Sequence, residues 1–272
     1  MSEETGGENK IKDTIDAVTG LVKAVPVYED ALQPVAKQLG KSLETVGRAV
    51  NVALLPLKGL VWSFEEIEKF FTPKLIHNLK DVPLEDIVPP KLHVAGPAIE
   101  ALRFTGHEES LSDMYANLLA TAMDKNTADG AHPAFVEIIR QLTPDEAKLI
   151  AYFMSSIAFP LVTVRSESKT GGGGFDMQKN VSLFARDAKL EVSRLVPTYL
   201  DNLSRLGLIS IPESYSYTGP NVYDELENID IVVMAKNFIE QNQERTCNLV
   251  RGAVVLTNLG RQFGSVCVQG RD

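Results

Sequence analysis

The stretch Tyr199-Leu-Asp-Asn-Leu-Ser-Arg-Leu-Gly-Leu-Ile209 decides the fold expected for the C-terminal half of this sequence. Its apolar residues recur every three or four positions, as on one face of a helix, until Gly207 ends the pattern. Residues 208–211 form a short apolar run that predicts a strand. Residues 253–256 predict a second strand, and Thr257 is suited to cap a last helix. This order of elements is that of a winged-helix-like unit.

The residues before this stretch supply the other elements of such a unit. In Thr143-Pro144-Asp145-Glu146 the threonine can cap a helix, the proline fits its first turn and the glutamate completes a capping box. A helix is therefore expected to run to about Ser156. Residues 160–164 alternate as in a strand, and the glycine run 171–174 predicts a flexible loop.

Two helices, residues 181–190 and 194–206, are then expected before the short strand. Together these elements place a winged-helix-like domain at residues 143–272. The wing tip of this domain is expected to hold an insertion at about residues 213–250. The apolar centre of residues 222–243 predicts a helix inside that insertion.

The N-terminal half has the periodicity of helices. Residues 11–80 repeat apolar side chains every three or four positions and predict long helices. Pro56 is expected to break this run because it cannot donate a backbone hydrogen bond, and Ser63 is expected to cap the helix that follows. Residues 1–10 are polar and acidic and are expected to be a disordered tail.

A proline-rich connector, residues 81–97, is expected to follow, with Pro97 in the first turn of the next helix. Residues 98–142 predict a helical hairpin that turns at Gly106, and a short helix over residues 133–140. We therefore expect a mainly α protein. An N-terminal helical bundle precedes a winged-helix-like α+β unit with an inserted helix in the wing.

Composition indicates an ordinary globular protein of the cytoplasm. Hydrophobic residues make up 44% and charged residues 23% of the 272 residues. The formal net charge of −9 works against broad nucleic-acid binding, which needs clustered Lys and Arg. The first ten residues do not resemble a signal peptide, and no run of about 18 uncharged apolar residues predicts a spanning helix. Cys247 and Cys267 lie in apolar surroundings and are expected to be buried thiols.

The absence of a recognised catalytic motif favours a protein that is not an enzyme and holds no cofactor or metal. The glycine run 171–174 lacks the Lys-Ser/Thr of a phosphate-binding loop, and neither HExxH nor a paired Glu-x-x-His occurs. Arg103 and His107 are closer in sequence than the Arg–His pair of HEPN ribonucleases, and a glycine between them is expected to break the helix. His132, just before a proline, is expected to cap a helix or lie at the surface.

The apolar segment 46–64 is a candidate contact surface. It could lie in a membrane interface, where tryptophan favours the headgroup level, contact a partner, or pack in a helical core. The core is favoured because the acidic segment 65–68 would be repelled by anionic lipid. The candidate membrane or partner contacts are Leu54, Leu57, Lys58, Leu60 and Trp62.

A winged helix also raises the possibility of DNA binding, since its second helix can enter the major groove. The cations available on that helix and the one before it are Arg186, Lys189, Arg194 and Arg205. Residues 161–272 hold twelve Lys or Arg against thirteen Asp or Glu, whereas a specific DNA-binding domain usually has a basic face. The indication of DNA binding is therefore weak.

Five stretches of the chain resemble the Abi-alpha (abortive infection alpha) family of bacterial proteins. They are residues 27–40, 52–62, 96–105, 114–124 and 132–147, which include the phrases ALLPLKGLVW, PAIEALRFT and YANLLATAMD. The resemblance extends over roughly residues 27–210. It implies a predominantly α-helical fold and a link to phage exclusion, and it brings no catalytic residues with it.

Three functions follow from these observations. The first is a non-enzymatic antiviral defence protein that recognises an unidentified phage or host protein. The alternative is a membrane-acting toxic effector that uses the apolar helix 46–64. The second alternative is a winged-helix DNA-binding regulator. The sequence leaves the trigger, the target and the oligomeric state open.

Overall fold

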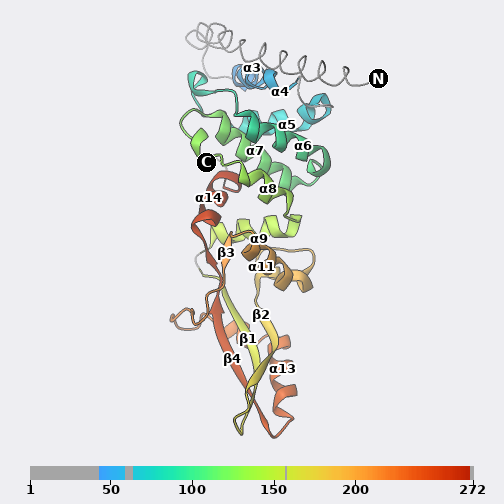
Figure 1. The fold of residues 1–272 in the computed structure, drawn as a ribbon, viewed down its shortest axis with the longest axis vertical. Coiled ribbons are helices and arrows are strands. Elements are labelled where there is room, and N and C mark those ends of the chain that lie inside the picture. Colours follow the sequence, from blue (N-terminus) through green and yellow to red (C-terminus); the bar gives the residue numbers. More distant parts are fainter. Residues whose placement is uncertain (1–42, 59–63, 157, 270–272) are drawn as a thin grey trace, which may run out of the picture. The chain divides into compact units, whose positions relative to one another are not determined.

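The computed structural model describes residues 43–58, 64–156 and 158–269. The chain separates into two compact units (Figure 1). The first contains the described residues up to Arg140, and the second runs from Gln141 to Gln269. The protein is mainly helical, as predicted, and it carries a small antiparallel sheet. Each unit is described by itself.

The first unit is a bundle of helices in which α7 is the most buried. Ten of the fifteen residues of α7 are buried, and the helix packs against α5, α6 and α8 (Figure 1). The α-helices of this unit are α3 (Leu43–Ala53), α4 (Leu55–Lys58), α5 (Phe64–Asn78), α6 (Leu92–Thr105), α7 (Glu109–Met123) and α8 (Ala134–Arg140). Short 3-10 turns lie at Leu84–Asp86 and Ala128–Gly130.

Two local predictions for the first unit are confirmed. The helical hairpin of α6 and α7 turns at Gly106, where an added Cβ would lie only 2.5 Å from Cζ of Phe70. The backbone N–H of Ala134 donates to Nδ1 of His132 over 3.1 Å, so this histidine caps the start of α8. The hairpin turn and the histidine cap each involve neighbouring residues, which explains why they could be predicted, whereas the approach of Phe70 to Gly106 is a long-range contact.

Pro56 and Pro97 occupy different positions in their helices. The helical run breaks between α3 and α4, so that Pro56 lies in the first turn of α4, where its missing N–H has no partner to lose. The placement of Pro97 in a first turn is wrong, because α6 begins at Leu92 and encloses it. Val94 and Ala95 are fully buried, and their packing outweighs the cost of an internal proline. The first turns of α6 thus lie within the expected connector.

Some predictions fall on residues that the structure does not describe. They are the tail at residues 1–10, the helical periodicity of residues 11–42, and the N-cap at Ser63.

The second unit combines helices with two small sets of strands. Its helices are α9 (Pro144–Ser155), α10 (Phe184–Asp187), α11 (Val196–Arg205), α12 (Asp224–Glu227), α13 (Asp230–Glu240) and α14 (Asn258–Cys267). Its strands are β1 (Pro160–Ser168), β2 (Gly174–Val181), β3 (Ile209–Ser210), β4 (Arg245–Ala253) and β5 (Val255–Leu256). Antiparallel pairing gives a three-stranded sheet in the order β2-β1-β4 and a separate β3–β5 pair.

Both predicted threonine caps are present in the second unit. The side chain of Thr143 accepts from the N–H of Glu146 over 3.2 Å, and Oε2 of Glu146 accepts from the N–H of Thr143 over 2.7 Å. This is the expected capping box of α9. At the start of α14, Thr257 accepts from the N–H of Gly260 over 2.8 Å.

The strand content of the second unit was underestimated. The helix expected at residues 181–190 is wrong at both ends, because Val181 ends β2 and only Phe184–Asp187 is helical. The glycine run 171–174 forms the turn between β1 and β2. The expected insertion, 213–250, holds α12 and α13 but also most of β4, which pairs with β1 along its whole length. This pairing joins residues about 80 positions apart, and local periodicity carries no information about it.

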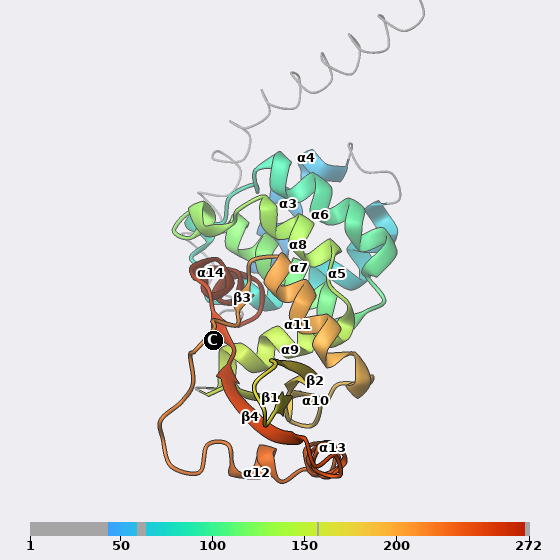
Figure 2. The ribbon, with the colours of Figure 1, turned by 60° about the horizontal axis from the view of Figure 1, so that its bottom comes forward.

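The two faces of the three-stranded sheet differ in what lies against them. Val162 and Val164 of β1 pack against an apolar cluster formed with α12 and α13, which lie next to β1 and β4 (Figure 2). The cluster residues contributed from outside the sheet are Tyr223, Leu226, Val232, Ala235 and Ile239. The alternate β1 residues face the opposite side of the sheet, since successive side chains of a strand point to opposite faces.

Candidate functional site

Helix α13 buries one of its faces against the sheet and exposes the rest of its surface. Val232, Ala235 and Ile239 are buried, and their spacing of three and four residues places them on one face. This inner face packs on the apolar cluster that covers β1. The helix is therefore held to the sheet by a small number of apolar contacts.

A second face of α13, turned by about 100° from the inner face, is apolar and exposed. Ile231, Met234 and Phe238 follow each other at intervals of three and four residues, with exposed fractions of 47%, 69% and 65%. We call these three residues the α13 stripe. Val233, which points to another side of the helix, is also exposed. Single exposed apolar residues are common, whereas several on one helix face mark an interaction surface.

The surroundings of the α13 stripe are acidic. Helices α12 and α13 carry a single cation, Lys236, against the carboxylates of Asp224, Glu225, Glu227, Asp230 and Glu240. Arg186 binds Glu225, and this ion pair lowers the pKa of the Glu225 carboxyl. Arg251 donates from Nε and Nη2 to the two carboxylate oxygens of Glu227, at 2.6 and 3.1 Å. The other three carboxylates take part in no ion pair within the described chain.

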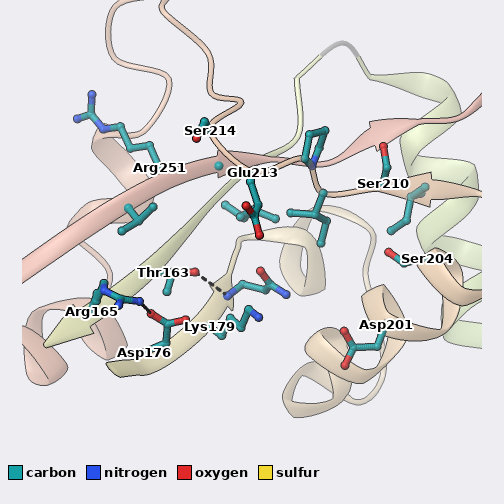
Figure 3. Close-up of a pocket in the computed structure, with 17 residues that line it drawn as sticks. Thr163, Arg165, Asp176, Lys179, Asp201, Ser204, Ser210, Glu213, Ser214 and Arg251 are labelled. Atoms are coloured by element: carbon teal, nitrogen blue, oxygen red, sulfur yellow. Dashed lines mark hydrogen bonds and ion pairs between the residues drawn. The ribbon is translucent and has the colours of Figure 1, made fainter. Parts of the chain in front are cut away.

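A cavity of about 750 Å3 lies on the other face of the sheet (Figure 3). Five segments of the second unit line it: β1, β2, α11, β4 and the chain from β3 to Ser214. Its charged lining residues are Arg165, Asp176, Lys179, Asp201, Glu213 and Arg251. Nη1 of Arg165 and Oδ1 of Asp176 form an ion pair of 2.8 Å at one end.

A buried carboxylate on α9 holds the start of α11, the helix that lines part of this cavity. Asp145 at the start of α9 accepts the backbone N–H groups of Glu191 and Val192, at 3.0 and 2.9 Å, and the hydroxyl of Tyr199 on α11 at 3.2 Å. Burial alone would raise the pKa of Asp145, but these donors, together with Lys148, lower it below its usual value. The sequence indicated Asp145 only as a first-turn acid, so this role was missed.

The residues predicted for membrane or partner contact do not form an exposed set. Leu54 and Leu57 are each only 1% exposed and belong to the core of the first unit. Lys58 is the last residue of α4, and Leu60 and Trp62 lie outside the described residues. Within the ranges 43–58, 64–156 and 158–269, no helix has the length and apolar character needed to cross a bilayer.

The cations predicted for DNA contact lie at the surface of the second unit. Arg186 on α10 is bound to Asp187 and Glu225, so carboxylates compensate its charge. Arg205 at the end of α11 donates to Asn202 and to Oε1 of Gln141. The remaining two, Lys189 and Arg194, are exposed. Neither forms an ion pair within the described part of the chain.

Neither cysteine is bonded to another residue through a disulfide. Cys267 is buried and Cys247 is partly buried, and burial raises the pKa of both thiols. Among the residues that the structure describes, no group of three or more His, Cys, Asp or Glu side chains is arranged to hold a metal ion.

Comparison with known proteins gives one family match and one structural match. The model of a family described as "Abortive infection alpha" matches residues 63–267, about three quarters of the chain. No curated protein matches the chain. The structure of an uncharacterized protein from the marine bacterium Alcanivorax borkumensis is 22% identical, over 49% of this chain and 94% of that one. Its TM-score is 0.32, and this likeness carries no argument about fold or function.

Proposed function

Because the chain belongs to the abortive infection alpha family, we propose that it is a cytoplasmic bacterial defence protein against phage that acts by recognising another protein and catalyses no reaction itself. The observation that carries this proposal is the α13 stripe. Three large apolar side chains on one helix face are largely exposed to water, where each forgoes part of the roughly 1.5–3 kcal/mol that complete burial of such a side chain contributes. A partner that covers them recovers this free energy.

The chemistry of the stripe restricts the partner. Met and Phe are adaptable or aromatic side chains of the kind that anchor protein interfaces. The carboxylates of Asp224, Asp230 and Glu240 leave the surroundings of the stripe negative. The partner we propose is a phage or host protein with an apolar centre bordered by Lys or Arg, since opposite charges raise the rate of encounter and exclude wrong partners.

The same charges argue against the two alternatives. An anionic lipid surface and a DNA backbone would both be repelled by the acids of α12 and α13. In the described part of the apolar segment 46–64, Leu55 is 53% exposed, whereas the predicted contact residues Leu54 and Leu57 are buried. A membrane-acting form that used Leu54 and Leu57 would first have to unpack the first unit. Arg186 is likewise occupied by carboxylates.

We also propose that residues 141–269 are a distant variant of the winged helix, used for protein contact. The order of α9, β1, α10, α11, β3, β5 and α14 supports this, as does the antiparallel pairing of β3 with β5. The β1–β2 hairpin and α12–α13 are then additions to that plan. Winged helices serve as protein-contact modules as well as DNA readers, so the fold alone does not decide between them.

A phage challenge tests the proposed function. Bacteria that express the protein are infected with a panel of phages, and plaque counts, membrane potential and chromosomal DNA integrity are followed. We expect fewer plaques for at least one phage, with no loss of membrane potential before cell death and no DNA cleavage. Early depolarisation would support the membrane alternative instead. Absence of protection against every phage would contradict the defence function.

A further inference from the structure

The cavity on the open face of the sheet is shaped by a β-bulge between β1 and β2. Val162 pairs with Val181 and Val164 with Gln178, so two residues of β2, Lys179 and Asn180, stand opposite Thr163 alone. A bulge adds one residue to a strand and breaks its alternation, and here both Lys179 and Asn180 line the cavity. Figure 3 shows Lys179 at the cavity, beside the bond between Thr163 and the bulged chain.

Asn180 is held in this bulge at a conformational cost. Its φ of 55° lies in the left-handed region, which a residue other than glycine adopts infrequently. The residue is only 9% exposed, and its backbone N–H donates to the hydroxyl of Thr163 over 3.5 Å. Its side-chain amide forms no hydrogen bond within the described chain and is open to the solvent of the cavity. This amide can therefore donate to and accept from a ligand that displaces the solvent of the cavity.

Three charged groups at the cavity remain unpaired. Lys179 of β2, Asp201 of α11 and Glu213 after β3 line it, and none of them forms an ion pair within the described chain. The figure shows Glu213 directed into the hollow from one side, with Lys179 and Asp201 on the other (Figure 3). The other two cations, Arg165 and Arg251, are already bound to Asp176 and Glu227.

This set of free groups excludes simple anions and simple cations. A nucleotide or other polyphosphate needs several free cations, and Lys179 is the one cation of the lining without a carboxylate partner. A polyamine would meet Asp201 and Glu213 but would be repelled by Lys179. A ligand that carries one positive and one negative group satisfies all three side chains.

We propose that this cavity binds a short peptide segment, with its carboxylate at Lys179 and its ammonium group at Asp201 and Glu213. The amide of Asn180 can both donate and accept, which matches the N–H and C=O of a peptide bond. The apolar lining residues Leu161, Ile209 and Val250 provide contacts for small side chains. A volume of about 750 Å3 is within the usual range for a ligand cavity. The site is separate from the α13 stripe.

The test measures binding of defined peptides to the full chain by titration calorimetry or NMR shift perturbation. The probes are tri-, tetra- and pentaalanine with free termini, each also in N-acetylated and C-amidated form. We expect one length to bind best with both termini free, and each cap to weaken its binding about tenfold, which corresponds to one charge-assisted contact. Equal binding of free and capped peptides, or no binding of any peptide, would overturn the proposal.

Variants assign the two charges of the peptide to their residues. Lys179→Met is expected to weaken binding of the peptide with free termini about tenfold and to leave binding of the C-amidated peptide unchanged. The substitution and the C-terminal cap remove the same contact, so their effects do not add. The double variant Asp201→Asn/Glu213→Gln is expected to do the same for the N-acetylated peptide. Lys236→Met and Glu240→Gln, on α13, serve as matched controls and are expected to bind like the unchanged protein. If the losses of affinity caused by a terminal cap and by the matching substitution simply add, the assignment of that peptide terminus to that residue is contradicted.

Asn180→Gly separates the amide from the backbone shape of the bulge. Glycine accepts the left-handed conformation without strain, so the variant is expected to keep its thermal midpoint while losing peptide affinity several-fold. Unchanged affinity would show that the amide does not contact the ligand. The blocked peptide acetyl-Lys-Ala-Ala-Ala-Glu-amide carries its two charges on side chains instead of on its termini. If it binds more tightly than the free alanine peptides, the ligand is an internal segment of a protein. If it binds more weakly, the ligand is a free oligopeptide.

Discussion

Helices α7 and α13 are both rich in apolar residues, yet they differ in how much of that apolar surface is covered. In α7 ten of fifteen residues are buried, and the helix packs against three others in the first unit. In α13 three of eleven residues are buried, and the α13 stripe faces solvent. Apolar content alone therefore does not decide the role of a helix. Helix α7 is a structural helix of the first unit, whereas α13 keeps an apolar surface that no described part of the chain covers.

The largest effect is expected from truncating a side chain of α7. Leu118 is completely buried, so Leu118→Ala should lower the free energy of unfolding of the first unit by roughly 2–5 kcal/mol through lost burial and a cavity. Urea unfolding monitored by circular dichroism measures this change. A loss below about 1 kcal/mol would mean that α7 is not the centre of a well-packed core.

A somewhat smaller effect is expected at Asp145, which fixes α9 to the start of α11. Asp145→Asn should cost roughly 1–3 kcal/mol at neutral pH, because an amide replaces a carboxylate that accepts three hydrogen bonds. The folded pKa lies below the unfolded value of about 3.9. The stabilisation is therefore present above that value and is lost as the pH falls through the folded pKa.

The measurement is urea unfolding of both proteins between pH 6 and pH 3. The difference in unfolding free energy between the unchanged protein and Asp145→Asn should narrow as the pH falls. A difference that stays constant with pH would show that the charge of Asp145 does not contribute.

Loss of a helix cap should have an effect of about 1 kcal/mol. In Thr257→Ala the N–H of Gly260 loses its side-chain acceptor at the start of α14. Ser265→Ala on the exposed face of the same helix is the matched control, since the Ser265 hydroxyl only donates to a carbonyl one turn back. Thermal unfolding of the two variants checks this prediction, and equal midpoints would contradict it.

The smallest effect on stability is expected at the α13 stripe. Met234→Asp and Phe238→Asp should each change the free energy of unfolding by no more than roughly 0.5 kcal/mol, because both side chains are mostly exposed. Sedimentation velocity of these variants should match that of the unchanged protein. Marked destabilisation, or conversion of a dimer to a monomer, would show that the stripe is covered within the protein or by a second copy.

Local features of this fold could be predicted from the sequence, and long-range ones could not. The capping box at Thr143, the cap at Thr257 and the turn at Gly106 each depend on residues within a few positions of one another. Strand β4 was hidden in the expected insertion because its partner β1 lies about 80 residues earlier. The helical periodicity of α13 was visible, but which of its apolar faces is covered depends on the sheet beneath it.

The cavity could not be predicted from the sequence either, because it also depends on residues far apart in the chain. The cavity is assembled from five segments, and neither Lys179 nor Asn180 is unusual until the bulge places both opposite Thr163. The predicted contact residues Leu54 and Leu57 had the right composition for a surface, but packing in the first unit buries them.

The most direct test of the proposed function compares phage protection by two double variants. Met234→Asp/Phe238→Asp places two charges on the α13 stripe, whereas Asn237→Asp/Gln241→Glu adds the same charge at two exposed polar positions, one on the same helix and one at its C-cap. With both proteins folded and equally abundant, we expect the stripe variant to lose protection against a phage that the unchanged protein restricts, and the matched variant to keep it. Full protection by the stripe variant would contradict recognition through α13.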